Sequence, residues 1–211
     1  LFDRLQSEKF LPLLPLRTMG SWMKLRIGET PLYAWNMPAD RQAVSPEDRS
    51  GISRDPGKFE VFLKDDSQNP TFSFKDRASA LVSAWAAENN IRTLIAASTG
   101  NAGSSLAGIC ASQGQKAIIV VPAAAPPAKL TQILMYGATL IPVSGTYDDA
   151  FALSVKLTEK YGWYNRNTAF NPLTIEGKKT VSFEIFSQLG YRVPDRIFIP
   201  VGDGVIFSGV C

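Results

Sequence analysis

A lysine stands at the position where the sequence predicts that a helix begins. Lys75 opens residues 75–90, a segment rich in Ala, Leu and Trp with helical spacing. The helix dipole disfavours a cation at this end, so the position lowers the pKa of the amine and favours the neutral form that condenses with a carbonyl group. The alternative is a solvated lysine, with Ser73 and Asp76 supplying capping and charge compensation. Taken alone, the segment favours this alternative.

A second segment combines small residues at the end of a predicted strand. Residues 98–105 read STGNAGSS and lead into a predicted helix. Backbone N–H groups at such a turn bind carboxylate or phosphate, and glycines let a ligand approach the main chain. A helix cap at a close helix–sheet crossing would also use small residues, but this run is longer than a cap needs. The segment therefore favours an anion site.

A glycine-rich segment follows the last predicted strand. Residues 202–209 read GDGVIFSG, and backbone amides in such a turn cradle phosphate groups. The segment is no dinucleotide fingerprint, because its third glycine comes too late, and no P-loop, because the lysine is absent. A phosphate site and a tight turn into another helix are equally compatible with it.

A polar segment lies between these two. Residues 165–172 read NRNTAFNP, and their asparagines together with Arg166 would form a polar wall for a substrate. Residues 176–180, EGKKT, follow. In isolation, a solvated loop that leads into a helix with Glu176 in its first turn is the simpler interpretation.

The composition excludes several kinds of site. The chain has 211 residues and no histidine, so on its own it forms neither a Ser-His-Asp triad nor a Cys-His pair nor a histidine metal site. Its cysteines, Cys110 and Cys211, lie far apart, which argues against a disulfide framework and a thiolate metal site and fits a reducing cytoplasm. We therefore expect no metal site.

Charges and apolar runs indicate which partners to expect. The net charge is +3, and the longest basic run, Lys178-Lys179, is too short for a nucleic-acid interface. No apolar run is long enough to span a bilayer, so we expect a cytoplasmic protein without a membrane partner. The apolar residues 10–16 are interrupted by prolines and are more typical of a surface-docking arm than of a signal peptide.

Strands and helices alternate along most of the chain. Short continuous apolar strands that alternate with helices predict an α/β fold, in which a parallel sheet is covered by helices on both faces. Ligands bind such sheets at the carboxyl ends of the strands. Residues 36–58, rich in Pro, Gly and charges, predict a linker. The predicted strands are 59–63, 94–97, 117–121, 138–143 and 196–201, and the predicted helices are 75–90, 101–113, 127–135, 148–160 and 176–189.

Taken together, these segments resemble the fold-type II pyridoxal-phosphate enzymes. Residues 69–77, NPTFSFKDR, are similar to the superfamily signature N-P-T-x-S-F-K-D-R. Residues 97–102, ASTGNA, resemble the substrate loop of these enzymes, and residues 200–204, PVGDG, resemble their phosphate loop. The combination, in the order and spacing of the superfamily, is specific although no single motif is.

Within the superfamily, the threonine synthase family is the most similar. Residues 28–32 (GETPL), 171–172 (NP) and 176–180 (EGKKT) support this choice, and the resemblance runs from about Gly28 to the end of the chain. The implied fold has two open parallel-sheet domains with helices on both faces.

The resemblance implies a role for each segment. Lys75 would bind pyridoxal phosphate covalently and, once the substrate releases it, move protons as a base. The cofactor is the electron sink, so the chemistry needs no histidine. Asn101 would hydrogen-bond the ring hydroxyl of the cofactor, and Ser98 and Thr99 would bind the substrate carboxylate. The amides that would bind the cofactor phosphate are those of Gly202, Asp203, Gly204, Val205 and Ile206.

The implied reaction is that of a lyase in threonine biosynthesis, which converts O-phospho-L-homoserine and water into L-threonine and phosphate. Arg166 and Asn171 would bind this small amino-acid substrate. The sequence departs from the family pattern at Thr174, where an arginine is common, and at Ala102, where a threonine is common. Either Arg166 supplies the missing charge, or the substrate carries no phosphate.

Two alternatives stay open. Another enzyme of the same fold, such as a threonine dehydratase, a cysteine or cysteate synthase or a diaminopropionate ammonia-lyase, would share the cofactor and differ in substrate. A non-catalytic α/β module would bind a metabolite without turning it over.

The resemblance also divides the chain. We expect residues 1–70 to form an N-terminal arm and the first part of the larger domain, and residues 71–172 to form a smaller domain with Lys75 and the substrate loop. Residues 173–211 would return to the larger domain with the phosphate loop, the remainder being absent. The apolar arm and Trp22 suggest a homodimer contact.

Overall fold

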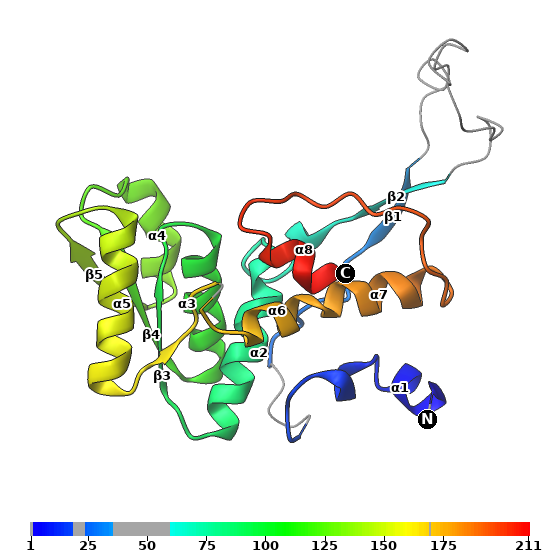
Figure 1. Ribbon diagram of the computed structural model, residues 1–211, viewed down its shortest axis with the longest axis horizontal. Coiled ribbons are helices and arrows are strands. Elements are labelled where there is room, and N and C mark those ends of the chain that lie inside the picture. Colours follow the sequence, from blue (N-terminus) through cyan, green and yellow to red (C-terminus); the bar gives the residue numbers. More distant parts are fainter. Residues whose placement is uncertain (1, 19–23, 36–59, 169) are drawn as a thin grey trace, which may run out of the picture.

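A parallel sheet of four strands, in the order β5-β4-β3-β6, forms one end of the elongated molecule (Figure 1). The structure is a computed structural model, and it describes residues 2–18, 24–35, 60–168 and 170–211. The central strands β3 and β4 are buried along almost their whole length, which is why both read as continuous apolar runs. The strands are β3 (Thr93–Ala97), β4 (Lys116–Pro122), β5 (Thr139–Val143) and β6 (Tyr164–Asn165).

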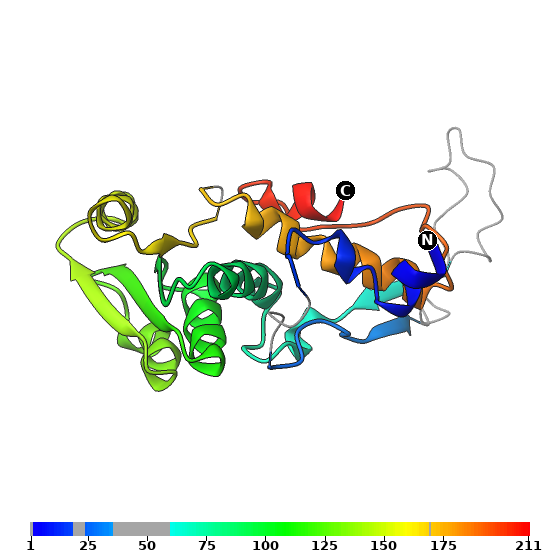
Figure 2. The ribbon, with the colours of Figure 1, turned by 90° about the horizontal axis from the view of Figure 1, so that it is seen from below.

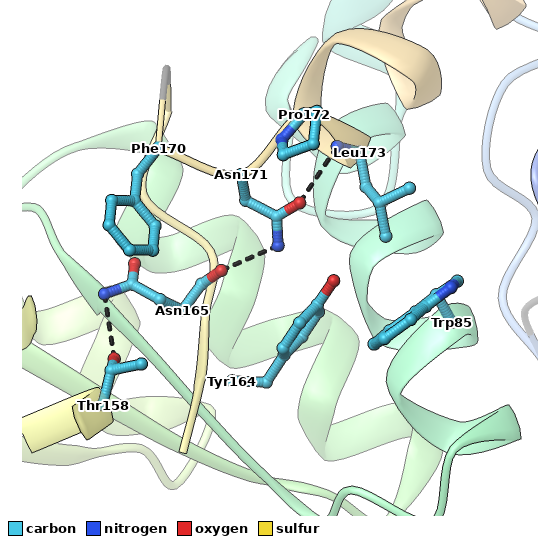
Figure 3. Close-up of a pocket in the computed structure, with 8 residues that line it drawn as sticks. All are labelled: Trp85, Thr158, Tyr164, Asn165, Phe170, Asn171, Pro172 and Leu173. Carbon is cyan, nitrogen blue, oxygen red and sulfur yellow. Dashed lines mark hydrogen bonds between the residues drawn. The ribbon is translucent and has the colours of Figure 1, made fainter. Parts of the chain in front are cut away.

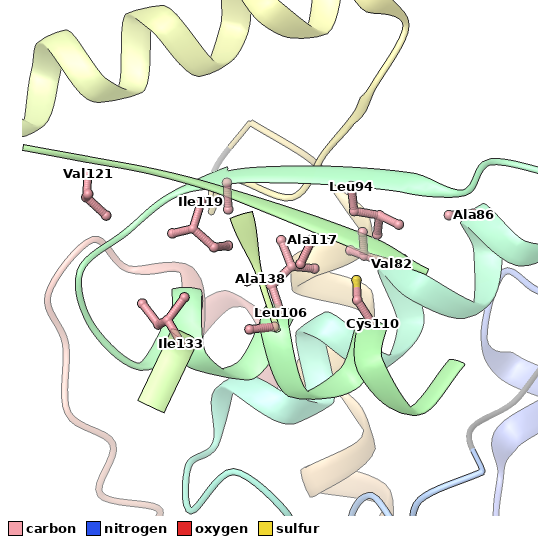
Figure 4. Packing of buried hydrophobic residues seen from close by; sticks show 12 residues of the cluster. Val82, Ala86, Leu94, Leu106, Cys110, Ala117, Ile119, Val121, Ile133 and Ala138 are labelled. Atoms are coloured by element: carbon pink, nitrogen blue, oxygen red, sulfur yellow. The ribbon is translucent and has the colours of Figure 1, made fainter. Parts of the chain in front are cut away.

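Helices cover both faces of this sheet. Figure 2 shows α5 (Tyr147–Tyr161) on one side and α3 (Asn101–Gln113) with α4 (Pro127–Met135) on the other. Side chains of β3 alternate between the faces: Leu94 packs in the cluster under α3 (Figure 4), whereas Ile95 packs in the cluster under α5. The expected α/β class, with a parallel sheet between helices, is confirmed.

Local signals set the ends of these helices. α4 begins at Pro127, whose fixed φ angle and missing N–H suit the first helical position. α3 ends before Gly114, which adopts the left-handed conformation with φ of 72°. At the start of α5, Thr146 and Asp149 form a capping box.

The opposite end of the molecule contains a small antiparallel sheet. Strands β1 and β2 pair there next to α7, while α2 and α6 lie between the two ends (Figure 1). The elements are α1 (Phe2–Ser7), β1 (Leu32–Trp35), β2 (Val61–Lys64), α2 (Lys75–Glu88), α6 (Leu173–Lys178), α7 (Thr180–Gln188) and α8 (Val205–Val210), with 3₁₀ turns at Leu11–Leu13 and Asp66–Gln68.

A buried arginine joins α2 to this end. The guanidinium of Arg77 donates to Asp66 through Nε and Nη2, at 2.6 and 2.7 Å, and to Glu184 of α7 through Nη1 and Nη2, at 2.6 and 2.8 Å. Lys64 of β2 also donates to Glu184, at 2.7 Å. Thr30 accepts from Arg77 at 3.1 Å. These five residues are called the Arg77 cluster below.

The apolar arm packs on its own chain. The ring of Phe10 lies 5.9 Å from that of Phe183 and 6.0 Å from that of Phe186, both on α7, and Leu14 is buried as well. Trp22 lies outside the described residues, so the homodimer contact stays a prediction.

One expected element is wrong, and another differs in its bounds. The helix predicted over 176–189 forms, but it begins earlier, where the Asn171 side chain accepts from Leu173 N, and a turn at Lys179 divides it into α6 and α7. The strand predicted over 196–201 does not form, because no described strand lies beside it to share hydrogen bonds. As a result, Phe198 is 92% exposed.

Two further findings concern the described ranges alone. The linker predicted over 36–58 lies outside them. Within them, no helix is long and apolar enough to cross a membrane.

Candidate active site

Lys75 is the first residue of α2, as the sequence predicts. Its backbone N–H donates to Ser73 Oγ at 3.2 Å, so Ser73 satisfies one of the free amides of the helix end. The side chain is half-buried. Burial lowers the pKa of Lys75, the positive charge of Arg166 lowers it further, and Asp203 opposes both. A lowered pKa increases the neutral fraction of the amine, the form that attacks a carbonyl carbon.

Arg166 lies directly after β6 and is fully buried. Its backbone N–H donates to Ile95 O at 2.8 Å, which extends the ladder of β3 and holds the residue at the carboxyl end of the sheet. Its Nε donates to Ser79 Oγ at 3.1 Å and its Nη1 to Thr168 Oγ1 at 3.0 Å. The remaining nitrogen, Nη2, is buried without a hydrogen-bond partner among the described residues.

The environment of Arg166 disfavours its charge. Burial lowers the pKa of Arg166 to about 10, against the opposing effect of Asp76 and Tyr147. The charge of Asp76 opposes this effect, although burial raises the pKa of Asp76 itself against the hydrogen bonds that its oxygens accept from Thr71. A buried charge with an unpaired N–H is expensive: even a neutral unsatisfied donor costs about 1–3 kcal/mol.

Lys178 is a second buried cation at this place, and the sequence did not reveal it. It is the last residue of α6, its exposed fraction is 1%, and its Nζ has no hydrogen-bond partner among the described residues. Burial lowers the pKa of Lys178 to about 7, with further lowering by Arg166 and Lys75 and an opposing effect of Asp203. Three cations therefore act on one another here.

A signal for the burial of Lys178 was present in the sequence. Thr174, Gly177 and Lys178 have the i, i+3, i+4 spacing of one helix face, and the structure buries all three. Gly177 allows the close crossing of α6 over α2, where an added Cβ would collide with the carbonyl oxygen of Arg77. The lysine adjacent to such a glycine is carried into the interior.

The glycine segment brings its acid to the same site. Asp203 acts electrostatically on both Lys75 and Lys178, so the segment that follows 196–201 faces the lysine of α2. Asp203 Oδ1 accepts from Val205 N at 3.1 Å, at the start of α8. Gly204 adopts φ of 77°, a conformation that glycine reaches without strain. The phosphate-binding role of the amides at 202–206 stays a prediction.

The small-residue segment is shaped by a close approach. A Cβ added at Gly103 would lie 2.6 Å from Ser98 O, so the first turn of α3 folds tightly against the loop that follows β3. Ser98 and Thr99 are half-buried, and Asn101 is exposed at the first position of α3. These residues are accessible, and the contacts expected of them with cofactor and substrate stay predictions.

Asn171 lies in a different environment. Its Nδ2 donates to Asn165 O at 2.8 Å and its Oδ1 accepts from Leu173 N at 2.9 Å (Figure 3). It lines a pocket of about 380 Å³ that is mainly apolar and includes Trp85 stacked on Tyr164. Lys75, Arg166 and Lys178 do not line this pocket. The structure thus brings Arg166 and Lys75 together and gives Asn171 contacts within the chain.

The chemical groups that the site offers are an amine and cations. Among the described residues, no three or more Cys, Asp or Glu side chains come together in a way that would hold a metal ion. The lysine amine, the adjacent glycine segment and the two orphaned cationic nitrogens define a site for a carbonyl compound that carries anionic groups.

Comparison with known proteins identifies the class to which this fold and site belong. Residues 25–211 match the family of pyridoxal-phosphate dependent enzymes, and the chain belongs to that family. Its curated relatives include the threonine synthase of Methanocaldococcus jannaschii, 34% identical over 96% of this chain and 46% of its own. The threonine synthase of Synechocystis sp. is 36% identical over 93% of this chain and 48% of its own. The chain thus spans about half the length of the curated relatives it matches.

Solved structures agree with this family. The threonine deaminase isoform 2 of Solanum lycopersicum has a TM-score of 0.68 at 26% identity, covering 97% of this chain and 51% of its own. Maize serine racemase has a TM-score of 0.64 at 27% identity, covering 71% of this chain and 45% of its own.

The residues present fit the cofactor that the family name implies. Pyridoxal phosphate carries an aldehyde and a phosphate, and the site holds a primary amine of lowered pKa that the glycine segment around Asp203 faces. The amine that would hold the aldehyde carbon is Lys75.

Proposed function

We propose that this chain belongs to a cytoplasmic lyase of the threonine synthase type, which converts O-phospho-L-homoserine and water into L-threonine and phosphate. The observation that carries the proposal is the surroundings of Lys75: a half-buried amine next to the buried cation Arg166. Its relatives over most of the chain carry the name threonine synthase. The amine suits the cofactor, and the cation suits a substrate with an anionic side chain.

In this function, Lys75 has two tasks. Its Nζ holds the cofactor covalently before the substrate enters. Afterwards the free amine takes a proton from the substrate carbon and returns a proton at a later step, which its lowered pKa makes feasible near neutral pH. Pyridoxal phosphate, when bound, supplies the electron sink for the carbanion chemistry.

The other residues bind and orient. Ser98 and Thr99 bind the substrate carboxylate, and Asn101 holds the cofactor ring through its hydroxyl. The backbone amides of 202–206 bind the cofactor phosphate. Arg166, which donates to Ser79 of α2 and is fully buried, supplies the positive charge that Thr174 does not.

A second candidate is a dehydratase of the same fold, which would release 2-oxobutanoate from threonine. Two observations favour it: Thr174 is buried and uncharged, and the threonine deaminase of Solanum lycopersicum has a similar fold over nearly the whole chain. The buried cations count against it, because threonine has no anionic side chain for them to bind.

Two measurements on the purified protein test the proposal. With pyridoxal phosphate, we expect an absorbance band near the visible edge that borohydride removes and that Lys75→Ala fails to form. Lys116→Ala, which changes an exposed lysine at the amino end of β4, is the matched control and should keep the band. A colourless wild-type protein would favour a metabolite-binding module instead.

Product analysis separates the two enzyme classes. O-phospho-L-homoserine should release phosphate in step with the appearance of threonine. Formation of 2-oxobutanoate from threonine, without phosphate release from O-phospho-L-homoserine, would replace the first candidate by the second.

A further inference from the structure

Two buried nitrogen atoms in the described ranges lack hydrogen-bond partners, and both belong to cations. They are Arg166 Nη2 and Lys178 Nζ. Buried polar groups in folded proteins are nearly always hydrogen-bonded. Two buried cationic donors without acceptors therefore indicate that an anion binds to them.

The two cations come from separate elements that converge next to Lys75. Arg166, after β6, donates to Ser79 of α2, and Gly177, which precedes Lys178 in α6, packs against the backbone of Ala78 in the same helix. In agreement with this placement, the charge of Arg166 lowers the pKa of both Lys75 and Lys178. Two carboxylates act on these cations by their charge: Asp76 raises the pKa of Arg166, and Asp203 raises those of Lys75 and Lys178. Among the described residues, however, no acceptor hydrogen-bonds Arg166 Nη2 or Lys178 Nζ.

Lys178 is held in this position. A Cβ added at Gly209 of α8 would lie 2.6 Å from the Cβ of Lys178, so α8 packs directly on the stem of the lysine. On the other side, Gly177 brings α6 into contact with the backbone of α2. These contacts fix the stem of Lys178, whose Nζ has no hydrogen-bond partner among the described residues.

The geometry of the two donors without partners indicates which kind of anion they bind. A carboxylate pairs best with two parallel N–H groups of one guanidinium. Nε and Nη1 of Arg166 each already donate a hydrogen bond, to Ser79 and Thr168, and Nη2 is the guanidinium nitrogen without a partner in the described ranges. The second donor without a partner there is a lysine amine on another element. A phosphate group, with three terminal oxygens in a tetrahedron and two negative charges, suits two separate cationic donors.

We propose that Arg166 Nη2 and Lys178 Nζ together bind one phosphate dianion beside Lys75, and that Lys178 thereby sets the preference for a phosphorylated substrate. The source of this phosphate rests on the proposed function, in which it is the substrate side chain. The binding of a dianion by the two cations does not depend on the reaction.

Binding is measured without turnover. Sulfate is titrated calorimetrically into the protein saturated with pyridoxal phosphate, for wild type, Lys178→Met and Lys179→Met. Lys179 is the matched control, because it is adjacent in sequence yet partly exposed in a surface ion pair with Glu176. We expect sulfate to bind about tenfold or more weakly to Lys178→Met and equally well to Lys179→Met. Equal sulfate affinity in wild type and Lys178→Met would overturn the proposal.

The pH dependence gives a test within the wild-type protein. Sulfate remains a dianion between about pH 6 and 9, whereas phosphate changes charge in this range. With Lys75, Arg166 and Asp203 as its charged neighbours, Lys178 loses its proton near pH 7, so sulfate affinity should fall as the pH rises above that value. A pH-independent affinity in wild type would contradict a role of Lys178 in holding the dianion, even if the methionine variant failed to fold.

Cofactor retention separates the two sources of the phosphate. If the dianion belongs to the substrate, Lys178→Met keeps its affinity for pyridoxal phosphate and raises KM for O-phospho-L-homoserine. If Lys178→Met instead loses the cofactor, the phosphate is that of the cofactor and the specificity role is refuted. Sulfate binding that depends on Lys178, in a protein that makes no threonine, would refute the proposed function and leave the dianion site intact.

Discussion

Two buried arginines of this chain have opposite environments. Arg77 and Arg166 are both fully buried, but every nitrogen of the Arg77 guanidinium donates a hydrogen bond, whereas Nη2 of Arg166 donates to no described group. Burial lowers the pKa of Arg77, yet the hydrogen bonds and charges of Asp66 and Glu184 outweigh it and raise this pKa above its ordinary value. For Arg166, burial prevails and the pKa falls to about 10.

The difference distinguishes an arginine that stabilises the fold from an arginine that is available to bind an anion. The Arg77 cluster is complete within the chain and joins β2, α2 and α7. Arg166 and Lys178 each keep a buried nitrogen to which no described residue is hydrogen-bonded, so folding leaves a cost that a bound anion would remove. Removing a paired charge should therefore destabilise the fold, and removing an unpaired one should not.

The largest effect is expected at the paired arginine. Arg77→Met removes the buried cation that Asp66 and Glu184 share and leaves Lys64 as the remaining cation of the cluster, so we expect the free energy of unfolding to fall by about 3–5 kcal/mol. Urea denaturation followed by circular dichroism measures it. A loss below about 1 kcal/mol, the range of exposed ion pairs, would show that the cluster does not hold the fold together.

The next effect concerns the crossing that carries Lys178 inward. Gly177→Ala places a methyl group against the carbonyl oxygen of Arg77, and we expect a loss of about 1–3 kcal/mol from overpacking. Gly100→Ala is the matched control, because a Cβ added there meets open space. Gly190 is unsuitable as a control, because its φ of 67° would strain an alanine. If both variants unfold at the same urea concentration, α6 and α2 are farther apart than described.

A smaller effect of opposite sign is expected at the unpaired lysine. At pH 6 and without phosphate or sulfate, Lys178→Met removes a buried cation without a hydrogen-bond partner in the described ranges and should raise the free energy of unfolding by at least about 1 kcal/mol. Differential scanning calorimetry of both proteins gives the comparison. A marked destabilisation would mean that Lys178 has a partner within the chain and belongs with Arg77 rather than with Arg166.

The smallest effect is expected in how the free energy of unfolding changes with pH. The pKa of Lys178 is about 7 in the folded chain and near 10.5 when unfolded, so between these values the unfolded state binds the extra proton. The free energy of unfolding therefore rises with pH from about 7 to 10.5 as the folded chain no longer holds a buried charge. Below about pH 7, where Lys178 is charged in both states, its burial destabilises the folded chain in full. The difference between wild type and Lys178→Met should shrink over that window. A constant difference would contradict the lowered pKa.

Much of the fold could be predicted from the sequence, because the residues that set the ends of these helices act locally. The helices at 101–113 and 127–135 have the predicted bounds, since Gly114 and Pro127 mark their ends by backbone geometry alone. The strand predicted at 196–201 fails for the opposite reason: an apolar run becomes a strand only next to another strand, and none of the described strands lies there.

The site was readable in part. The position of Lys75 at a helix start follows from its own segment, but its proximity to Arg166 and Asp203 joins three segments distant in sequence. In the sequence, Lys178 is simply one of two consecutive lysines. Its burial could not be predicted from them, because it depends on where α6 crosses α2. Only the spacing of Thr174, Gly177 and Lys178 carried that information.

The most direct test of the account is to locate the cofactor on the chain. Two lysines at the site, Lys75 and Lys178, have lowered pKa values, and the account assigns the covalent role to the first and anion binding to the second. Borohydride reduction of the protein with pyridoxal phosphate, followed by peptide mass mapping, should give a single adduct on Lys75. An adduct on Lys178 would contradict both assignments.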